Sequence, residues 1–125
     1  MTLQITRISQ IAIVVHDLGK AEDFYKNTLG LKHLFSAPPQ VAFFDIGGTR
    51  IMLSLPEPQV DYKSAIVYFD VADIHAGHEE LRAKGVPSLG APHVVGKLGD
   101  KEVWIAEFKD PDGNLLALQS ITPAK

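Results

Sequence analysis

The side chains of this chain that could do chemistry are five histidines and several carboxylates and tyrosines, since there is no cysteine. Disulfides and thiolate metal sites are therefore excluded. His75 and His78 are three residues apart and precede Glu79, a spacing that can place metal ligands on one helix face. His93 is a candidate acid or base, with an exposed loop histidine as the alternative. The other candidates for proton transfer are Tyr68, Asp70, Glu102 and Glu107.

Composition and charge limit the classes of protein that these groups can serve. The chain has 125 residues, of which 46% are hydrophobic, and a net charge of −3 with both signs interspersed. This predicts a single domain over 1–125 with a core of its own. The sequence has no stripe of basic residues, so we do not expect nucleic acid as a partner. No apolar run is long enough to span a membrane. The N-terminus does not resemble a secretory signal, and the lack of cysteine favours a cytoplasmic location.

Two similar segments position the candidate residues. Strand-like runs at 11–16 and 67–72 lead into Asp17 and Asp73, at an offset of 73 − 17 = 56 residues. Each aspartate is an expected helix N-cap, because its short carboxylate accepts bonds from amides of the first turn. The spacing predicts helices over 18–29 and 74–84, each ended by a glycine. A short strand is expected after each helix, at 31–36 and 86–89.

A hairpin closes each segment. The run 43–54, with its turn at 46–49, matches the run 108–119, with its turn at 110–114, at an offset of 113 − 48 = 65 residues. The predicted order is strand, helix and three strands, twice over. The modules cover about 5–55 and 64–121, with a junction at 55–63 and a turn at Pro38 and Pro39. The segment 95–101 is interpreted as a longer loop, either a lid over a site or an exposed connector.

These motifs resemble those of a known family. The resemblance is carried by IAIVVHDL at 11–18, FY at 24–25, LGL at 29–31 and FKDPDGNLLALQ at 108–119. The family is the vicinal oxygen chelate superfamily, which includes glyoxalase I, bleomycin-resistance proteins and extradiol dioxygenases. The resemblance implies an α+β fold in which two βαβββ modules form an eight-stranded, half-barrel-like cleft with the helices outside.

The resemblance also implies where a metal would bind. Enzymes of this family hold a divalent metal with four inward side chains, one in the first strand and one in the last strand of each module. The two offsets place these positions at Gln10, Met52, Ile66 and Ala117. Gln10 has a suitable amide oxygen and Met52 a soft thioether, whereas the other two have no donor. We therefore expect no metal and no cofactor. Because the helices form an outer layer, we interpret His75 and His78 as solvated; His16 and His33 are interpreted as structural or exposed.

Strand alternation predicts which side chains line the cleft. Pairing Phe108 with Leu115 across the last turn points Trp104 and Phe108 inward, and we take this register. A shift of one residue would point Val103 and Glu107 inward instead. An apolar concavity with few polar groups is typical of a small-molecule site, although the aromatic rings would also fit a collapsed core. The ligand-binding candidates are Gln10, Phe43, Met52, Ser54, Ile66, Tyr68, His93, Trp104, Phe108, Ala117 and Gln119.

Two main functions stay open at the level of sequence. The first, which we favour, is a small-molecule-binding protein of the glyoxalase/bleomycin-resistance type that holds a partly aromatic ligand in a metal-free cleft. The second is an enzyme of the superfamily, a lyase, isomerase or oxygenase, with a non-standard or metal-free active site. An interaction module without a ligand is a third possibility. By analogy with the family, a homodimer is expected.

Overall fold

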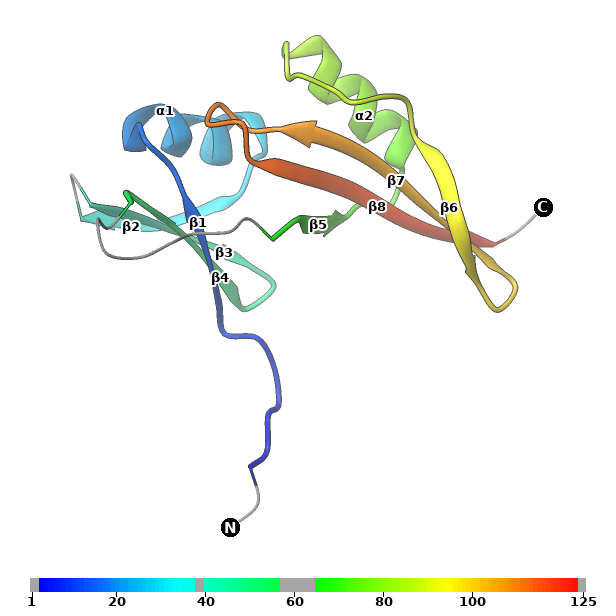
Figure 1. Cartoon of the computed structure of the whole chain (residues 1–125), viewed down its shortest axis with the longest axis horizontal. Coiled ribbons are helices and arrows are strands. Elements are labelled where there is room, and N and C mark those ends of the chain that lie inside the picture. Colours follow the sequence, from blue (N-terminus) through cyan, green and yellow to red (C-terminus); the bar gives the residue numbers. More distant parts are fainter. Residues whose placement is uncertain (1–2, 38–39, 57–64, 124–125) are drawn as a thin grey trace. The chain divides into compact units, whose positions relative to one another are not determined.

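The computed structural model describes residues 3–37, 40–56 and 65–123. The chain divides into two compact units, Met1–Tyr62 and Lys63–Lys125. Figure 1 shows a sheet and a helical segment in each unit, and each described sheet has four strands and does not close on itself. The element order repeats as strand, helix and three strands, which confirms the predicted α+β fold of two βαβββ modules. The turn at Pro38 and Pro39 and most of the junction at 55–63 lie outside the described residues.

The sheet of the first unit has the strand order β1-β4-β3-β2, with β1 and β4 parallel and the other neighbours antiparallel. Its helical segment is capped by Asp17, whose Oδ1 accepts a hydrogen bond of 3.1 Å from the backbone N of Lys20. The helix expected over 18–29 changes from α to π geometry halfway along. The elements are β1 (Gln10–Val14), α1 (Leu18–Asp23), the π-helical η1 (Phe24–Thr28), β2 (Lys32–Ala37), β3 (Val41–Ile46) and β4 (Thr49–Ser54).

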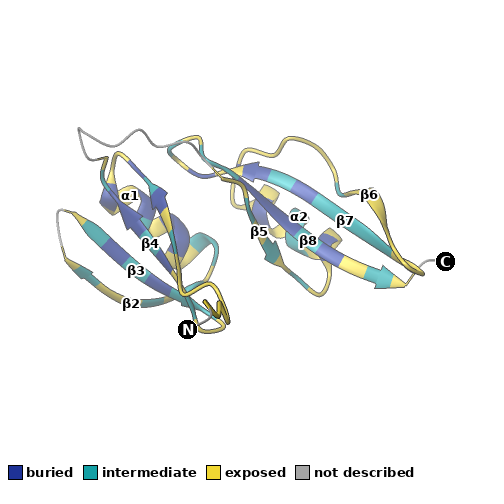
Figure 2. Ribbon diagram, turned by 60° about the horizontal axis from the view of Figure 1, so that its bottom comes forward, coloured by how far each residue is buried: buried dark blue, intermediate teal, exposed yellow. Residues whose placement is uncertain are grey.

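One face of the first sheet is covered by this helical segment. Tyr25 of η1 is fully buried, and its ring centroid lies 6.2 Å from that of Phe44 on β3. Phe44 pairs with Ile51 on β4, so both side chains point towards the helix. Burial alternates along β3 (Figure 2), as expected for a strand with one covered face. We call the opposite side the helix-free face of the first sheet.

The second unit repeats this arrangement with the strand order β5-β8-β7-β6. Its helix is capped by Asp73, whose Oδ1 accepts a 3.1 Å hydrogen bond from the backbone N of Ala76. Gly85, with φ of +78°, follows the helix in the left-handed conformation that favours glycine. No described helix is long and apolar enough to cross a membrane. The elements are β5 (Val67–Asp70), α2 (Ile74–Ala83), β6 (His93–Leu98), β7 (Lys101–Lys109) and β8 (Leu115–Pro123).

The strand expected at 86–89 and the longer loop expected at 95–101 are both wrong. Only an isolated bridge, between Ser88 and Phe108, forms in the first segment. The strand that follows α2 is instead β6, which pairs with β7 and covers most of the expected loop. Pro87 and Pro92 lack the amide protons that a ladder needs, which explains why regular pairing starts only at His93.

The register expected across the last turn is also wrong. Phe108 pairs with Leu116, not with Leu115. The turn of the first unit has two residues between Ile46 and Thr49, which are ladder partners. The turn of the second unit is longer, because the backbone N of Asp110 bonds to the carbonyl oxygen of Asn114 at 3.0 Å and leaves three residues between them. One extra residue shifts the strand before the turn, so side chains on β7 point to the face opposite to that expected.

Candidate functional site

Two stacked aromatic rings lie on the helix-free face of the first sheet. Phe43 on β3 is the ladder partner of Phe35 on β2 and of Met52 on β4. The ring centroids of Phe35 and Phe43 are 4.6 Å apart and their planes differ by 30°. Phe35 is 53% exposed. The stack therefore presents aromatic surface on the side of the sheet that its own helix does not cover.

Polar side chains border this aromatic stack. The guanidinium carbon of Arg50 lies 5.8 Å from the centre of the Phe43 ring, within the range of a cation–π interaction. Nε2 of Gln10 donates a hydrogen bond of 3.8 Å to Sδ of Met52. Gln10 and Arg50 are ladder partners on β1 and β4, so they lie side by side. We call Gln10, Phe35, Phe43, Arg50 and Met52 the aromatic cluster.

Phe35 is a member of the cluster that was not among the sequence candidates. Alternation alone would put it on the same face as His33, whose ring contacts Phe44 at a centroid distance of 5.3 Å on the helix-covered face. The β2–β3 ladder shifts register between His33 and Phe35. This bulge turns Phe35 to the other face, beside Phe43. The adjacent aromatic residues at 43 and 44 were the available signal that both faces of β3 carry rings.

The helix-free face of the second sheet gathers titratable side chains. Leu118 faces α2, because a Cβ on Gly77 would lie 3.1 Å from its Cδ1. Ala117 and Gln119 therefore point to the other face, together with their ladder partners, about 5 Å away on neighbouring strands. Two adjacent rows across this face are Tyr68, Ala117 and Glu107, followed by Asp70, Gln119, Ile105 and His93.

The remaining sequence candidates do not all lie on the helix-free faces of the two sheets. Ser54, with 8% exposure, shares the side of Met52 two residues earlier on β4. Ile66 lies just before β5 and is 40% exposed. Trp104 and Phe108 lie on the helix-covered face of the second sheet, where the ring centroids of Trp104 and His75 are 5.0 Å apart. They are therefore not on the face that carries Tyr68 and Gln119.

The residues at the four expected ligand positions do not fit the metal that the resemblance implies. Gln10 directs its amide nitrogen to the sulfur of Met52. Tyr68 and Glu107 flank Ala117, which is itself fully buried and has no donor. In the described part of the chain, no group of three or more histidine, aspartate or glutamate side chains is arranged to hold a metal ion. One hard oxygen donor among four positions is too few for such an ion.

Comparison with known proteins identifies the family. The model of the Glyoxalase/Bleomycin resistance protein/Dioxygenase superfamily matches residues 7–118. The chain belongs to this superfamily, which confirms the resemblance drawn from its motifs.

Individual relatives agree with this assignment. Uncharacterized protein YraH of Bacillus subtilis (strain 168) is 29% identical, over 90% of this chain and 96% of the relative. Human mitochondrial methylmalonyl-CoA epimerase is 31% identical, over 90% of this chain and 73% of the relative. Among solved structures, lactoylglutathione lyase from Agrobacterium tumefaciens has a TM-score of 0.79 at 21% identity, covering 94% of this chain and 95% of that chain. This last similarity concerns the fold.

Proposed function

We propose that the chain is a small-molecule-binding protein that holds a partly aromatic ligand on the aromatic cluster without a metal. The observation that carries this proposal is the Phe35–Phe43 stack with the Arg50 guanidinium 5.8 Å from the Phe43 ring centre. A ligand ring gains from offset stacking on such a surface. A guanidinium pairs preferentially with a planar carboxylate. An aromatic carboxylate matches both features.

The other members of the cluster support the same class of ligand. The Met52 side chain is flexible and polarizable, so it can adapt to the edge of a ring. Gln10 uses an amide hydrogen on Met52, and its amide oxygen is an acceptor for a ligand hydroxyl or amine. A few polar groups around an apolar surface are usual in small-molecule sites. Direct packing and hydrogen bonds thus take the place of chelation.

The proposal is tested by titrating the full chain, labelled with ¹⁵N, with 4-hydroxybenzoate in the presence of EDTA. We expect saturable shifts of amide signals on β1, β3 and β4. Arg50→Gln should weaken binding about tenfold, the loss expected for one charge-assisted hydrogen bond. Arg82→Gln is the matched control, because Arg82 is exposed on α2 and pairs with Glu79 at 2.9 Å. Shifts confined to other elements, or equal weakening by both substitutions, would refute the proposal.

The assembly and location expected from the sequence also belong to this proposal. We infer a cytoplasmic homodimer by analogy with the family. Light scattering of the chain at micromolar concentration should give about twice the mass of 13.6 kDa for one chain. A mass of one chain would contradict the dimer and leave the binding proposal standing, because every residue of the aromatic cluster comes from one unit.

A second candidate function is a metal-free enzyme of proton transfer. The observation that favours it is the row in which Tyr68 and Glu107 flank Ala117, with His93 and Asp70 in the next row. A carboxylate and a phenol on two sides of a small residue could exchange a proton with a bound carbon acid. The family relative named methylmalonyl-CoA epimerase suggests methylmalonyl-CoA as the probe.

This second function is tested by proton NMR in D₂O. Exchange of the α-proton of methylmalonyl-CoA should be catalysed by the unaltered chain and lost in Glu107→Gln. Glu79→Gln, at an exposed position of α2, is the control for the removed charge. Absence of exchange above the uncatalysed rate would exclude this reaction for the chain.

A further inference from the structure

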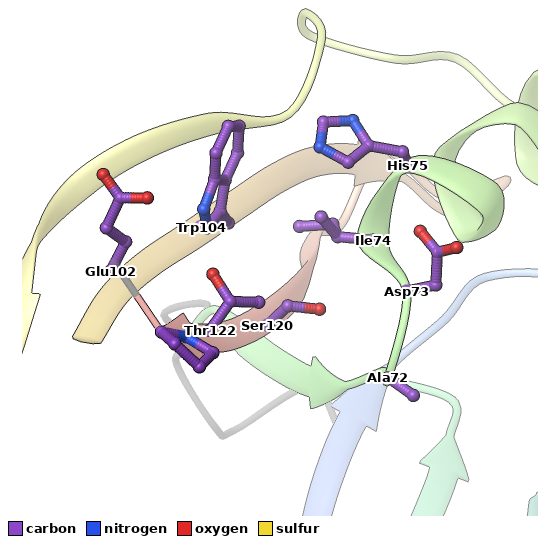
Figure 3. A pocket seen from close by; sticks show the side chains of 9 residues that line it. Ala72, Asp73, Ile74, His75, Glu102, Trp104, Ser120 and Thr122 are labelled. Atoms are coloured by element: carbon purple, nitrogen blue, oxygen red, sulfur yellow. The ribbon is translucent and has the colours of Figure 1, made fainter. Parts of the chain in front are cut away.

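A hollow of about 710 Å³ lies on the helix-covered side of the second sheet, at the beginning of α2 (Figure 3). Its volume is in the usual range for small-molecule sites. Asp73 and His75 border it from the helix end, and Glu102 and Trp104 border it from β7. Ser120 and Thr122 of β8 also line it. None of these residues belongs to the aromatic cluster.

The hollow exists because the helix is shorter than the strands it covers. β7 and β8 have nine residues each, which span about 30 Å, whereas the ten residues of α2 span about 15 Å. Trp104 lies where this cover ends. Its ring meets that of His75 edge-on at a centroid distance of 5.0 Å and an angle of 71°. The indole therefore forms a wall of the hollow and is only partly covered by the helix.

The charged groups that line this hollow are the carboxylates of Asp73 and Glu102. Oδ1 of Asp73 caps α2, which leaves the second carboxylate oxygen for another partner. The Ser120 hydroxyl donates its proton to the carbonyl oxygen of Val71 at 2.5 Å and offers only lone pairs to the hollow. Glu102 adds a second carboxylate, whereas no lysine or arginine lines the hollow. Lys97, the ladder neighbour of Glu102, lies on the exposed edge strand β6 and is not part of the lining.

We propose that this hollow binds a small organic cation, in which an ammonium group is attached to an apolar body. The ammonium group bonds to Glu102 and lies against the Trp104 indole, which attracts a cation through its ring. The apolar body packs on Ile74, which also lines the hollow. The site is independent of the proposed function, because the hollow lies on the second sheet, the aromatic cluster lies on the first sheet, and the two sites select opposite charges.

The chain contains a single tryptophan, so its fluorescence reports directly on this site. Titration of the full chain with benzylammonium chloride should give a saturable change in emission. Benzyl alcohol has the same ring and no charge, and it should bind at least about tenfold more weakly, since hydrogen bonds to charged groups are the stronger ones. Equal affinity for the two compounds, or no saturable change with benzylammonium, would overturn the proposal.

Substitutions locate the interaction. Glu102→Gln should weaken benzylammonium binding about tenfold. Glu79→Gln removes the same charge from the outer side of α2, where Glu79 pairs with Arg82, and should leave the affinity unchanged. Equal affinity of Glu102→Gln and the unaltered chain would overturn the proposal. If circular dichroism shows that Glu102→Gln is not folded, the proposal is tested by the affinities of the unaltered chain for benzylammonium and benzyl alcohol alone.

Discussion

The side-chain amide of Gln10 donates a hydrogen bond to the sulfur of Met52 across a distance of 3.8 Å. These residues occupy the two positions of the first module at which the enzymes of the superfamily are expected to hold a metal. Here the two side chains bind each other, beside the Phe35–Phe43 stack and Arg50. The contact between Gln10 and Met52 thus adjoins an aromatic pair and a guanidinium group on the helix-free face of the first sheet.

Phe44 and Phe35 should differ strongly in their contribution to stability. Phe44 is fully buried between the sheet and η1, whereas Phe35 is 53% exposed. Phe44→Ala should lower the free energy of unfolding by about 3–5 kcal/mol, because it leaves a cavity in the core. Phe35→Ala should cost less than about 1 kcal/mol, as expected for an exposed position. Urea denaturation followed by circular dichroism measures both, and a similar loss for the two variants would contradict the assigned faces.

Among the residues of the last turn, Asp110 should be the one whose substitution lowers the stability of the fold most. Asp110 is 3% exposed, and its carboxylate accepts hydrogen bonds from the backbone N of Asp112 at 2.9 Å and of Asn114 at 2.8 Å. Asp110→Ala should lower the free energy of unfolding by about 2–3 kcal/mol, because these donors lose a charged partner. Asp100→Ala, in the exposed β6–β7 turn, should have little effect. Equal midpoints of chemical denaturation for the two variants would count against this role.

The two aspartates that cap the helices should contribute equally to the free energy of unfolding. Asp17 and Asp73 each accept a 3.1 Å bond from the backbone amide three residues later. Replacement of either by alanine should cost about 1 kcal/mol, whereas asparagine, an equally good cap, should cost much less. Thermal unfolding of the four single variants measures the difference. If asparagine were as harmful as alanine at both positions, capping would not be the reason for the loss.

A small network of hydrogen bonds should stabilise the packing of α1 against β2. Ser36 Oγ donates to Oε1 of Glu22 at 2.7 Å, and Nε2 of His33 lies 3.1 Å from the same oxygen. Because the Glu22 side chain is 28% exposed, Glu22→Ala should cost only about 1 kcal/mol of unfolding free energy. Glu80→Ala should cost about half of that or less, since Glu80 forms only a surface pair with Lys84. Urea denaturation should rank the two variants in this order.

The internal repeat predicted most of the fold, because caps, glycines and hairpin turns are local signals. Asp17 and Asp73 cap helices as expected. The errors arose where one residue changes the alternation of a strand. The longer turn after Asp110 moved Trp104 and Phe108 to the helix-covered face, and the bulge before Phe35 moved that ring into the aromatic cluster. Both insertions lie in pairs of strands that follow each other in the chain, and each reverses the side chains beyond it, so the alternation along a single strand does not reveal them.

The central claim is that the aromatic cluster binds its ligand without a metal. It is tested most directly by isothermal titration calorimetry of 4-hydroxybenzoate into the chain, first in EDTA and then after dialysis into MnCl₂ or ZnCl₂. We predict the same dissociation constant in all three conditions, and weaker binding for Phe43→Leu in each of them. Binding that appears only with a divalent metal, or that survives Phe43→Leu unchanged, would contradict the claim.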